Sequence, residues 1–569
     1  MHRRRVWQTC AAAAAMAGAG YTYDRTAQAS AAWRTLRTFI DVLVICADYK
    51  VNFRASNDAP ALDRVHERAA ARLLRRCQEN GGLYIKFGQS IAVQSALLPP
   101  VFRSQLQGLY DSAPSVELES LRPVVERSLG APLDSVFAEF SPRAVASASV
   151  AQVHRARLLG DPEGCWVAVK VQKPEIKRQI TWDLFTLRTC ARLMERAFEI
   201  PLMWSVAEVE QRLREELDFL REAHNAERAH ADLERLADGW LRASVYIPRV
   251  RWQATAREVL TTEWISGTSL VDPRRLLACG WRSKEVMQRV VSLFAFQVFV
   301  SGNVHGDPHP GNILVRPTPG SPHVPQVVLL DHGLYVRETR EFRRQLAEFW
   351  RSAALADRKG MRRIAGAWGM PDAAAFAAMM TVRPADVMAQ LGRRDPDGLP
   401  AEGGAYKGHM LVKQRAVAAL RDARGLPPAL VFVVRNANIV RALNQRLGIP
   451  VDRTRILGHY AARGLRHLLV SEAWDPASRY SADRGVSLTG GGWLAALGAV
   501  LSAEWRYATF RVAVGVAAVA LALHSAWLRV VERFTGRKPP DVEAALDEAV
   551  RRAVEAKLGY SIDASLFSA

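Results

Sequence analysis

The chain has 569 residues, 49% of them hydrophobic, so two or three domains with a sizeable core are expected. It carries 77 basic and 57 acidic residues, and the resulting net charge of +20 suits a nucleotide or an anionic membrane surface as partner. No nucleic-acid-binding module accompanies that charge, so nucleic acid is not expected as a partner, and six scattered cysteines without Cys-x-x-Cys spacing exclude a disulfide framework or a zinc knuckle.

The first 23 residues have the character of a targeting segment. They contain arginines at positions 3–5 and the small apolar run Thr9–Gly20, and no acidic residue precedes Asp24. Organellar transit peptides have this composition, and a secretory signal has a similar shape. Because the scattered thiols fit a reducing or matrix-like compartment, we expect residues 1–30 to be a mitochondrial targeting segment.

Helices are expected over residues 31–50 and 61–79, the second rich in Arg and Ala and ended by Gly81-Gly82. The first has its apolar residues mostly on one face. These residues are Trp33, Leu36, Phe39, Ile40 and Val44.

A third helix is predicted over residues 83–97, before Pro99-Pro100. It carries Lys86-Phe87-Gly88-Gln89, in which Lys86 and Gln89 share a face and the glycine permits close approach of another backbone. Lys and Gln on one helical face are most often simply solvated, so the motif is informative only in combination with other motifs of the chain.

A small-residue loop is the first candidate nucleotide contact. After a helix expected to stop at Gly130, the chain reads Ala146-Ser147-Ala148-Ser149-Val150-Ala151-Gln152 between two predicted short strands. Small side chains let backbone N–H groups approach phosphates, though with less conformational freedom than Gly gives. An Ala/Ser-rich strand edge is an equally good interpretation of this stretch by itself.

The next candidate is a lysine on a strand. Residues 166–171 have strand character, and Lys170 lies near their end. A lysine that follows a phosphate-covering loop and precedes a Glu-bearing helix is typical of the residue that binds the α- and β-phosphates of ATP and pairs with that Glu. A plain surface lysine is the alternative interpretation.

A helix is expected over residues 175–200, and the helix after it contains several acidic residues. We expect Glu216 to be the partner of Lys170. Asp218 and Glu222 are further acids, for a metal ion or for Lys86. A solvated charged face is the alternative, which the interleaved Leu and Phe side chains disfavour.

Strands are predicted over residues 245–250 and 259–264. The second leads into Thr261-Thr262-Glu263-Trp264, a candidate connector whose backbone holds an adenine ring and which ends at Gly267. Within it, we place the gatekeeper side chain at Thr262 and a nucleotide contact at Glu263.

The most informative stretch comes after a helix predicted over residues 284–300. It reads His305-Gly306-Asp307-Pro308-His309-Pro310-Gly311-Asn312, and Asp331-His332-Gly333 lies beyond a Pro/Gly hairpin turn at 317–325 and a strand at 327–330. This is the spacing of a phosphoryl-transfer site. Asp307 is then the candidate base, and Asn312 and Asp331 are candidate Mg²⁺ ligands, because Mg²⁺ prefers oxygen and bridges nucleotide phosphates. A polar loop is the alternative, which the length and composition disfavour.

The last third is expected to be mostly helical. Residues 392–407 are polar and Gly-rich, which predicts a mobile loop. Residues 512–528 carry no charge, and 17 residues is the low end for a membrane-spanning helix, so an interfacial segment or a core helix is as good an interpretation. A charged amphipathic helix is expected after Pro540.

Together these motifs resemble the UbiB/aarF-domain family of atypical kinases, also called ABC-one-like, over roughly residues 60–450. The resemblance rests on Lys86 to Gln89, the Ala-rich loop, Lys170, Glu216 to Asp218, and the set Asp307, Asn312 and Asp331. The run from Leu329 to Tyr335 is similar to a mitochondrial subgroup with Asp-His-Gly in place of Asp-Phe-Gly.

The resemblance implies ATP or ADP and Mg²⁺ as cofactors, and an extension in which Lys86 and Gln89 cover the active site and block a protein substrate. Eukaryotic members are mitochondrial or plastid and membrane-associated, and many support coenzyme Q or prenyl-lipid metabolism. An inner-membrane location, anionic lipid and a small-molecule or lipid-like acceptor are therefore expected. Gly306 in place of Arg, and His332 in place of Phe, depart from ordinary kinases and question activation-loop sensing and the usual Phe switch.

We predict an α+β, two-lobed protein-kinase-like fold. The expected divisions are a helical extension over residues 31–115, an N-lobe over 116–265, a C-lobe over 266–470 and a helical tail over 471–569 with a possible membrane segment at 512–528. The predicted activity is ATP- and Mg²⁺-dependent phosphoryl transfer. One alternative is a nucleotide-binding membrane adaptor with little turnover. Another is a small-molecule phosphotransferase of the aminoglycoside/choline type, and the Lys86 to Gln89 extension and the Ala-rich loop argue against this second alternative.

Overall fold

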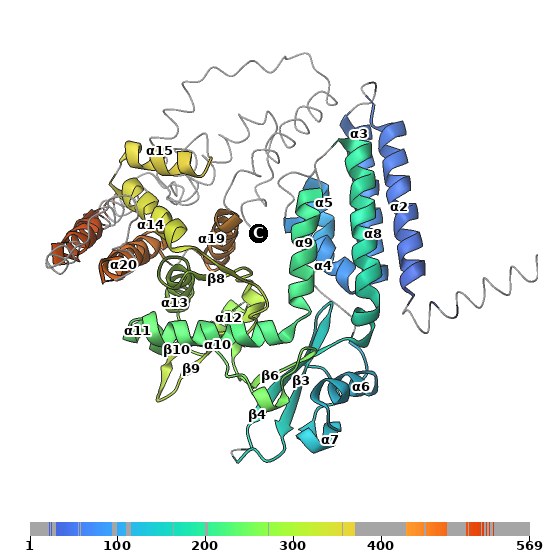
Figure 1. Cartoon of the computed structure of the whole chain (residues 1–569), viewed down its shortest axis with the longest axis horizontal. Coiled ribbons are helices and arrows are strands. Elements are labelled where there is room, and N and C mark those ends of the chain that lie inside the picture. Colours follow the sequence, from blue (N-terminus) through green and yellow to red (C-terminus); the bar gives the residue numbers. More distant parts are fainter. Residues whose placement is uncertain are drawn as a thin grey trace, which may run out of the picture. The chain divides into compact units, whose positions relative to one another are not determined.

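The computed structural model describes residues 30–54, 59–93, 100–109, 115–199, 203–369, 428–448, 451–474 and 500–513, with single-residue gaps at 163, 271 and 356 and a few isolated residues elsewhere. The chain divides into two compact units, of which unit 1 is Met1–His224, Arg249–Trp264 and Pro400–Asp422. Unit 2 is Asn225–Pro248, Ile265–Leu399 and Ala423–Ala569 (Figure 1). The α+β, two-lobed class is confirmed, whereas the finer domain boundaries stay predictions.

Unit 1 contains a five-stranded antiparallel sheet. Its order is β1 (Phe137–Phe140), β3 (Ala151–Leu158), β4 (Trp166–Gln172) and β6 (Val259–Glu263), and β2 (Ala146–Ser147) also pairs with β3. One face packs against α6 (Leu118–Leu129) and α7 (Leu133–Val136) around a core that includes Val167, Val169 and Val171. The helix α6 ends at Gly130, as predicted, because glycine readily adopts the φ of 69° found there.

In chain order, the other helices of unit 1 either precede the strands of the sheet or lie between β4 and β6. They are α2 (Ala31–Asn52), α3 (Ala59–Asn80), α4 (Leu83–Val93), α5 (Pro100–Leu106), η2 (Gln107–Leu109), α8 (Pro174–Phe198), α9 (Met203–Glu216) and the first residues of α10 (Phe219–Leu236), with η3 (Trp252–Ala254) after them. The predicted helices at 31–50, 61–79 and 175–200 are confirmed. The acidic run, expected on one helix, is divided between α9 and α10, because the chain turns at Leu217-Asp218.

Unit 2 contains two small sheets. The first has the order β5 (Val245–Tyr246), β10 (Ser321–Leu329), β9 (Ile313–Thr318) and β7 (Thr268–Ser269), and the second pairs β11 (Tyr335–Arg337) with β8 (Asn303–His305). The predicted strand at 245–250 is shorter than expected. The predicted turn at 317–325 is also too long, because β9 and β10 continue through Pro317 and Pro325, which pair with each other. Only residues 319 and 320 lie between the strands, and Gly320 has a φ of 76°.

The helices of unit 2 support these sheets. They are α11 (Gly239–Ser244), α12 (Pro273–Ala278), α13 (Ser283–Phe296), η4 (Gln297–Ser301), η5 (Pro310–Asn312), α14 (Arg340–Ala354), α15 (Arg358–Ala367), α19 (Pro428–Arg446) and α20 (Arg453–Trp474). The segment η4 is a π-helical turn, a local irregularity that is frequent at functional sites. At Gly464 of α20, an added Cβ would lie 2.1 Å from the carbonyl oxygen of Phe299, so only glycine lets α20 pack this closely against η4.

Four predictions fall mainly outside the described residues. They concern the targeting segment, the loop at 392–407, the uncharged run 512–528 and the helix after Pro540. Among the described residues, none of the helices combines the length and the apolar character that crossing a bilayer requires.

Candidate active site

Lys170 is placed by the alternation of strand β4. Val169 and Val171 point into the core beneath the sheet and are fully buried, so Lys170 projects from the opposite face. Its pairing partners are Val153 on β3 and Leu260 on β6. Because β4 is an inner strand with neighbours on both sides, the backbone that carries this lysine is held rigidly.

The partner of Lys170 is Glu222, and the expectation of Glu216 is wrong. Lys170 Nζ lies 2.8 Å from each carboxylate oxygen of Glu222, which is only 4% exposed, and it also lies 5.2 Å from the centre of the Phe219 ring. The turn at Leu217-Asp218 starts a new helix, and the first turn of α10 presents Glu222 to the sheet. A paired, desolvated lysine of this kind can be directed at phosphate oxygens.

Glu216 belongs instead to the Lys86 motif. It is the last residue of α9, and its Oε2 lies 3.1 Å from Lys86 Nζ. Gln89 donates from its side-chain amide to the carbonyl oxygen of Leu109 at 3.0 Å. Helix α4 is thereby tied to α9 and to η2, which makes the motif part of the packing of unit 1.

The glycine of that motif allows a close approach, but to side chains rather than to the expected backbone. A Cβ on Gly88 would lie 2.3 Å from Leu109 Cδ1 and 3.1 Å from Cys77 Sγ. Asp218, the remaining acid of the run, accepts from Arg257 Nη2 at 3.1 Å. It is therefore occupied by an arginine that sequence spacing did not indicate, and not by Lys86.

The Ala-rich loop is the turn between β2 and β3. Ala146 and Ser147 pair with Val153 and Gln152, so the tip consists of residues 148–150. Lys173, which no sequence motif indicated, donates from Nζ to the carbonyl oxygen of Ala148 at 2.7 Å and holds the tip. The hydroxyl of Ser149 is buried and has no hydrogen-bond partner in the described part of the chain.

Gln152 has a structural role in this loop, contrary to the expectation that it contacts nucleotide. Its side-chain amide is 1% exposed, and it exchanges two hydrogen bonds of 2.8 Å with the backbone N–H and C=O of Val116. It also donates to His154 Nε2 at 2.8 Å, while His154 Nδ1 donates to the carbonyl oxygen of Ser141. The loop is thus braced from behind by a buried polar chain.

The candidate connector is held mainly by backbone bonds. Glu263 donates its N–H to the carbonyl oxygen of Arg249 at 3.0 Å, and its carboxylate accepts the N–H of Arg249 at 3.0 Å. Thr262 lies opposite Ala168 of β4. The gatekeeper and adenine-contact roles of these residues stay predictions.

In unit 2, His305 joins the two aspartates of the predicted site. It lies on β8, and its ring Nδ1 accepts the backbone N–H of Asp307 at 3.1 Å while Nε2 donates to the carbonyl oxygen of Asp331 at 2.7 Å. Burial lowers the pKa of His305, which keeps the ring neutral and able to make both bonds. This histidine is part of the sequence motif, but the spacing of the motif assigns it no role.

Strand register brings the two candidate metal ligands together. Ile313 pairs with Leu329, and the N–H of Leu330 donates to the carbonyl oxygen of Asn312 at 2.9 Å, so Asn312 and Asp331 flank the paired strands β9 and β10 at the same end. Asp331 Oδ1 accepts the N–H of Gly333 at 2.8 Å, which fixes one carboxylate oxygen in a tight turn. Both side chains offer the oxygen atoms that Mg²⁺ prefers.

His332, the residue in place of Phe, is buried and fixed on both sides. Its Nε2 donates to the carbonyl oxygen of Leu329 at 3.1 Å, and its Nδ1 accepts from the Tyr335 hydroxyl at 3.0 Å. The carbonyl oxygen of His332 accepts from Asn225 at 3.0 Å. These bonds hold the ring in one position, in keeping with the expected loss of a Phe-type switch.

Gly306 stands where ordinary kinases have Arg, and the structure gives a steric reason. A Cβ there would lie 2.6 Å from Leu334 Cγ, and the N–H of Gly306 donates to the carbonyl oxygen of Leu334 at 2.8 Å. The chain entering β11 therefore approaches the loop too closely for any side chain. Asp307 follows directly, so this glycine sets its position.

Two residues of the site come from helix α19 and were not predicted from the sequence. Arg435 Nη2 lies 3.4 Å from Asp307 Oδ1, and Asn436 donates from its side-chain amide to the carbonyl oxygen of His305 at 2.9 Å. Asp307 keeps a side-chain exposure of 42%, so the arginine does not bury the carboxylate. Residue spacing within a motif could not link positions so far apart in the chain, and no sequence signal pointed to these two residues.

The chain is similar to known proteins over most of its length. Residues 108–365 match the profile of the ABC1 atypical kinase-like domain. An ABC1 family protein of Schizosaccharomyces pombe is 37% identical over 80% of this chain and 84% of that protein. An ABC1 family protein of Purpureocillium lilacinum is 35% identical over 78% and 79%, and the AarF domain-containing protein kinase 1 of Mus musculus is 31% identical over 73% and 78% of the two chains.

Proposed function

Because the chain belongs to the ABC1 (UbiB/aarF) family of atypical kinase-like proteins, we propose that it binds ATP with Mg²⁺ and transfers the terminal phosphoryl group to water or to a small or lipid-like acceptor. The observation that carries the proposal is the ring of His305, which links the backbones of Asp307 and Asp331 while the register of β9 and β10 sets Asn312 beside Asp331. Hydrogen bonds thus position Asp307, Asn312 and Asp331, the three groups that the proposed phosphoryl transfer needs.

The residues of unit 2 fit the proposed metal. Asn312 and Asp331 offer one amide and one carboxylate, which suits a cation that takes its other ligands from phosphates and water. The described part of the chain has no group of three or more His, Cys, Asp or Glu side chains that could hold a metal alone. When bound, Mg²⁺ supplies charge neutralisation on the phosphates.

The chain's own residues have separate tasks in this proposal. Asp307 accepts the hydrogen bond of the attacking hydroxyl or water and orients it, and Arg435 holds the Asp307 carboxylate. Lys170, aligned by Glu222, contacts phosphate oxygens, and the tip at residues 148–150 covers them with backbone N–H groups. Catalysis by such a set is mainly electrostatic positioning.

The experiment is ATP hydrolysis by the full chain with Mg²⁺, compared with Asp331→Asn. Turnover should fall by a factor on the order of 100 to 1000 in the variant, because a group aimed at developing charge is lost. The matched control is Glu285→Gln, a partly exposed carboxylate of unit 2 that pairs with Arg282, and it should leave turnover unchanged. Tight ATP binding without turnover in the wild-type protein would overturn the proposal and leave a nucleotide-binding adaptor.

The cellular setting is a further part of the proposal. The arginine-rich, acid-free first 23 residues support a mitochondrial address, and the family resemblance supports work in lipid or coenzyme Q homeostasis at the inner membrane. Import of the full chain into isolated mitochondria, with arginines 3–5 replaced by Gln as the comparison, tests the address. Import that does not depend on these arginines contradicts it.

A further inference from the structure

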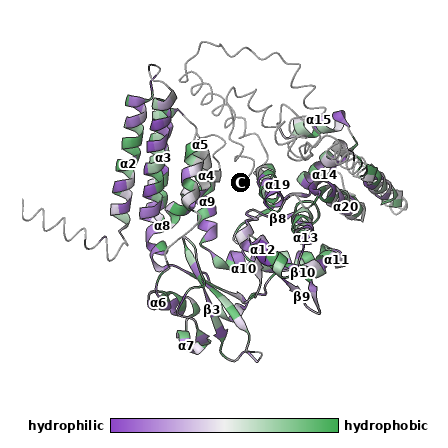
Figure 2. Ribbon diagram, turned by 180° about the vertical axis from the view of Figure 1, so that it is seen from behind, coloured by the Kyte–Doolittle hydropathy of each residue, from purple (hydrophilic) through white to green (hydrophobic). Residues whose placement is uncertain are grey.

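Helix α2 is amphipathic, but its polar side is the one that faces the protein. Arg34, Thr35, Thr38 and Asp41 are all less than 9% exposed. Ala31, Val42 and Cys46 are buried too, but more of the buried side chains are polar than apolar. This departs from the usual arrangement, in which the apolar face of a surface helix packs against the core. Figure 2 shows hydrophilic and hydrophobic residues alternating along α2.

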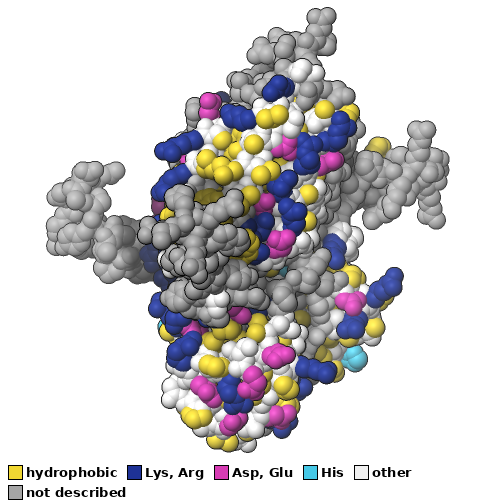
Figure 3. Space-filling model, turned by 90° about the vertical axis from the view of Figure 1, so that its right-hand side faces the viewer, with side chains coloured by type: hydrophobic (Ala, Val, Ile, Leu, Met, Phe, Trp, Pro, Cys, Tyr) yellow, Lys and Arg dark blue, Asp and Glu magenta, His cyan; other side chains and the backbone are white. Residues whose placement is uncertain are grey.

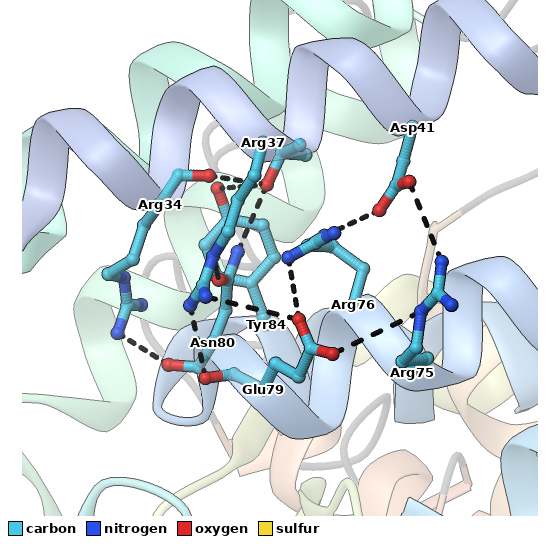
Figure 4. Close-up of polar contacts among 9 residues, drawn as sticks. Arg34, Arg37, Asp41, Arg75, Arg76, Glu79, Asn80 and Tyr84 are labelled. Carbon is cyan, nitrogen blue, oxygen red and sulfur yellow. Dashed lines mark hydrogen bonds and ion pairs between the residues drawn. The ribbon is translucent and has the colours of Figure 1, made fainter.

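The charged residues of the buried side pair with residues of α3 and α8. Arg34 Nη2 lies 2.7 Å from Asp183 Oδ2, and Arg76 Nε lies 2.5 Å from Asp41 Oδ2. Figure 4 shows side chains of α2 pointing towards Arg76, Glu79 and Asn80 of α3. Turning α2 over would leave these charges buried without partners, which is costly, so the helix is locked with its apolar side outward.

That outward side is an aliphatic stripe, which we call the α2 stripe. Its residues are 36% to 56% exposed, and the first three have the four- and three-residue spacing of one helix face. They are Leu36, Ile40, Leu43, Val44 and Val51. Helix α8, which packs beside α2, also exposes Trp182 and Phe185. Exposed apolar residues gathered on neighbouring helices in this way are typical of an interaction site.

The charge around the stripe is positive. Lys50 and Arg54 are exposed at the end of α2, and the neighbouring helices expose Arg64, Arg75, Arg178, Arg192 and Arg196. The acidic residues of α2 do not offset them, because Asp41 is buried and Asp48 is 2.7 Å from Arg68. Helix α3 also exposes Asp63, Glu67 and Glu79, which are fewer than these basic residues. Figure 3 shows Lys and Arg side chains around hydrophobic ones in the upper part of that face.

We propose that the α2 stripe docks onto the surface of an anionic lipid bilayer, with α2 lying in the plane of the interface. A bilayer offers an apolar layer for the stripe and negative headgroups for the basic rim. The buried polar side keeps the helix at the surface, because moving α2 into the bilayer would also move its paired charges into the hydrocarbon, which is energetically costly. This inference is independent of catalysis, since none of these residues belongs to the candidate active site.

The test is co-sedimentation of the full chain with phosphatidylcholine vesicles, with and without phosphatidylglycerol. The variant replaces Leu36, Ile40 and Leu43 together by Gln, and the control replaces Leu159 and Leu277 by Gln, which are exposed to 58% and 71% elsewhere. We expect wild type and control to bind anionic vesicles, the stripe variant to bind at least about tenfold more weakly, and added salt to weaken binding.

Equal binding of the stripe variant and the wild type overturns the proposal. The proposal is also overturned if the wild-type protein does not bind vesicles but forms a dimer that the stripe variant does not form. That result would assign the stripe to contact with a second copy of the chain. A melting curve checks that the variant is folded, and Ile40→Gln alone replaces the triple variant if it is not. Asp331→Asn should bind vesicles like the wild type, which separates this result from failure of the proposed catalysis.

Discussion

Replacing Glu222 by Gln tests whether Glu222, and not the expected Glu216, is the partner that aligns Lys170. Both Glu222 oxygens lie 2.8 Å from Lys170 Nζ, and Glu222 is almost fully buried, so two charge-assisted hydrogen bonds in a desolvated setting align this lysine. Gln keeps the shape and one acceptor but removes the charge. Two charge-assisted bonds of about 1.5 kcal/mol each are then replaced by one neutral bond of about 1 kcal/mol, so the loss is about 2 kcal/mol, or on the order of 30-fold in kcat/KM for ATP.

The comparison variant is Glu216→Gln. Its carboxylate pairs with Lys86 at 3.1 Å, and both side chains are more than a quarter exposed, so a loss below about 1 kcal/mol is expected. The assay measures kcat/KM for ATP and the melting temperature of each variant at matched ionic strength. A loss with Glu216→Gln as large as with Glu222→Gln, in proteins that are equally folded, would refute the assignment of Glu222 as the partner.

Three further predictions concern other parts of the chain. Arg435→Gln should lower kcat about tenfold or more, because the guanidinium beside Asp307 holds the carboxylate that orients the acceptor, and added guanidinium should restore part of the rate. Gly464→Ala should lower the free energy of unfolding by about 3 kcal/mol, because the new methyl group meets the carbonyl oxygen of Phe299. Burial lowers the pKa of His154, so the stability that depends on its neutral form should be complete at about pH 7 and be lost as the pH falls to about 5 in urea unfolding experiments.

Each of these has a matched control. Arg446→Gln on the same helix should keep kcat, and an equal loss there would remove the special role of Arg435. Gly366→Ala, which has open space around the new Cβ, should change stability by at most about 1 kcal/mol in the favourable direction. His154→Gln should flatten the acid side of the stability profile, and an unchanged profile would contradict the role of this histidine.

Local patterns predicted the elements and the polar motifs well. The strand character around Lys170 predicted β4, and Gly130 predicted the end of α6. The spacing of Asp307, Asn312 and Asp331 predicted a set of residues that strand register brings together. These features depend on residues near one another in the chain, where hydrophobic periodicity and turn chemistry act directly.

Pairings between elements were not predictable in the same way. Glu216 and Glu222 are equally good partners for Lys170 by spacing alone, and only the turn at Leu217-Asp218 decides between them. The apolar face of α2 was recognised, but periodicity cannot say which face is buried when the polar one has charged partners on other helices. Arg435 and Asn436 depend on long-range packing, on which local spacing carries no information.

The contact of α19 with the catalytic loop bears on how the protein is made. Asn436 and His305 are 131 positions apart, so a ribosome must synthesise that whole stretch before the loop has its last support. Gly464, which backs the π-helical turn, emerges later still. The nascent chain therefore carries Lys170 and Glu222 well before the loop around Asp307 has its last support. A chain cut at residue 365, where the family match ends, is expected to keep the motifs and lose the order that makes them act together.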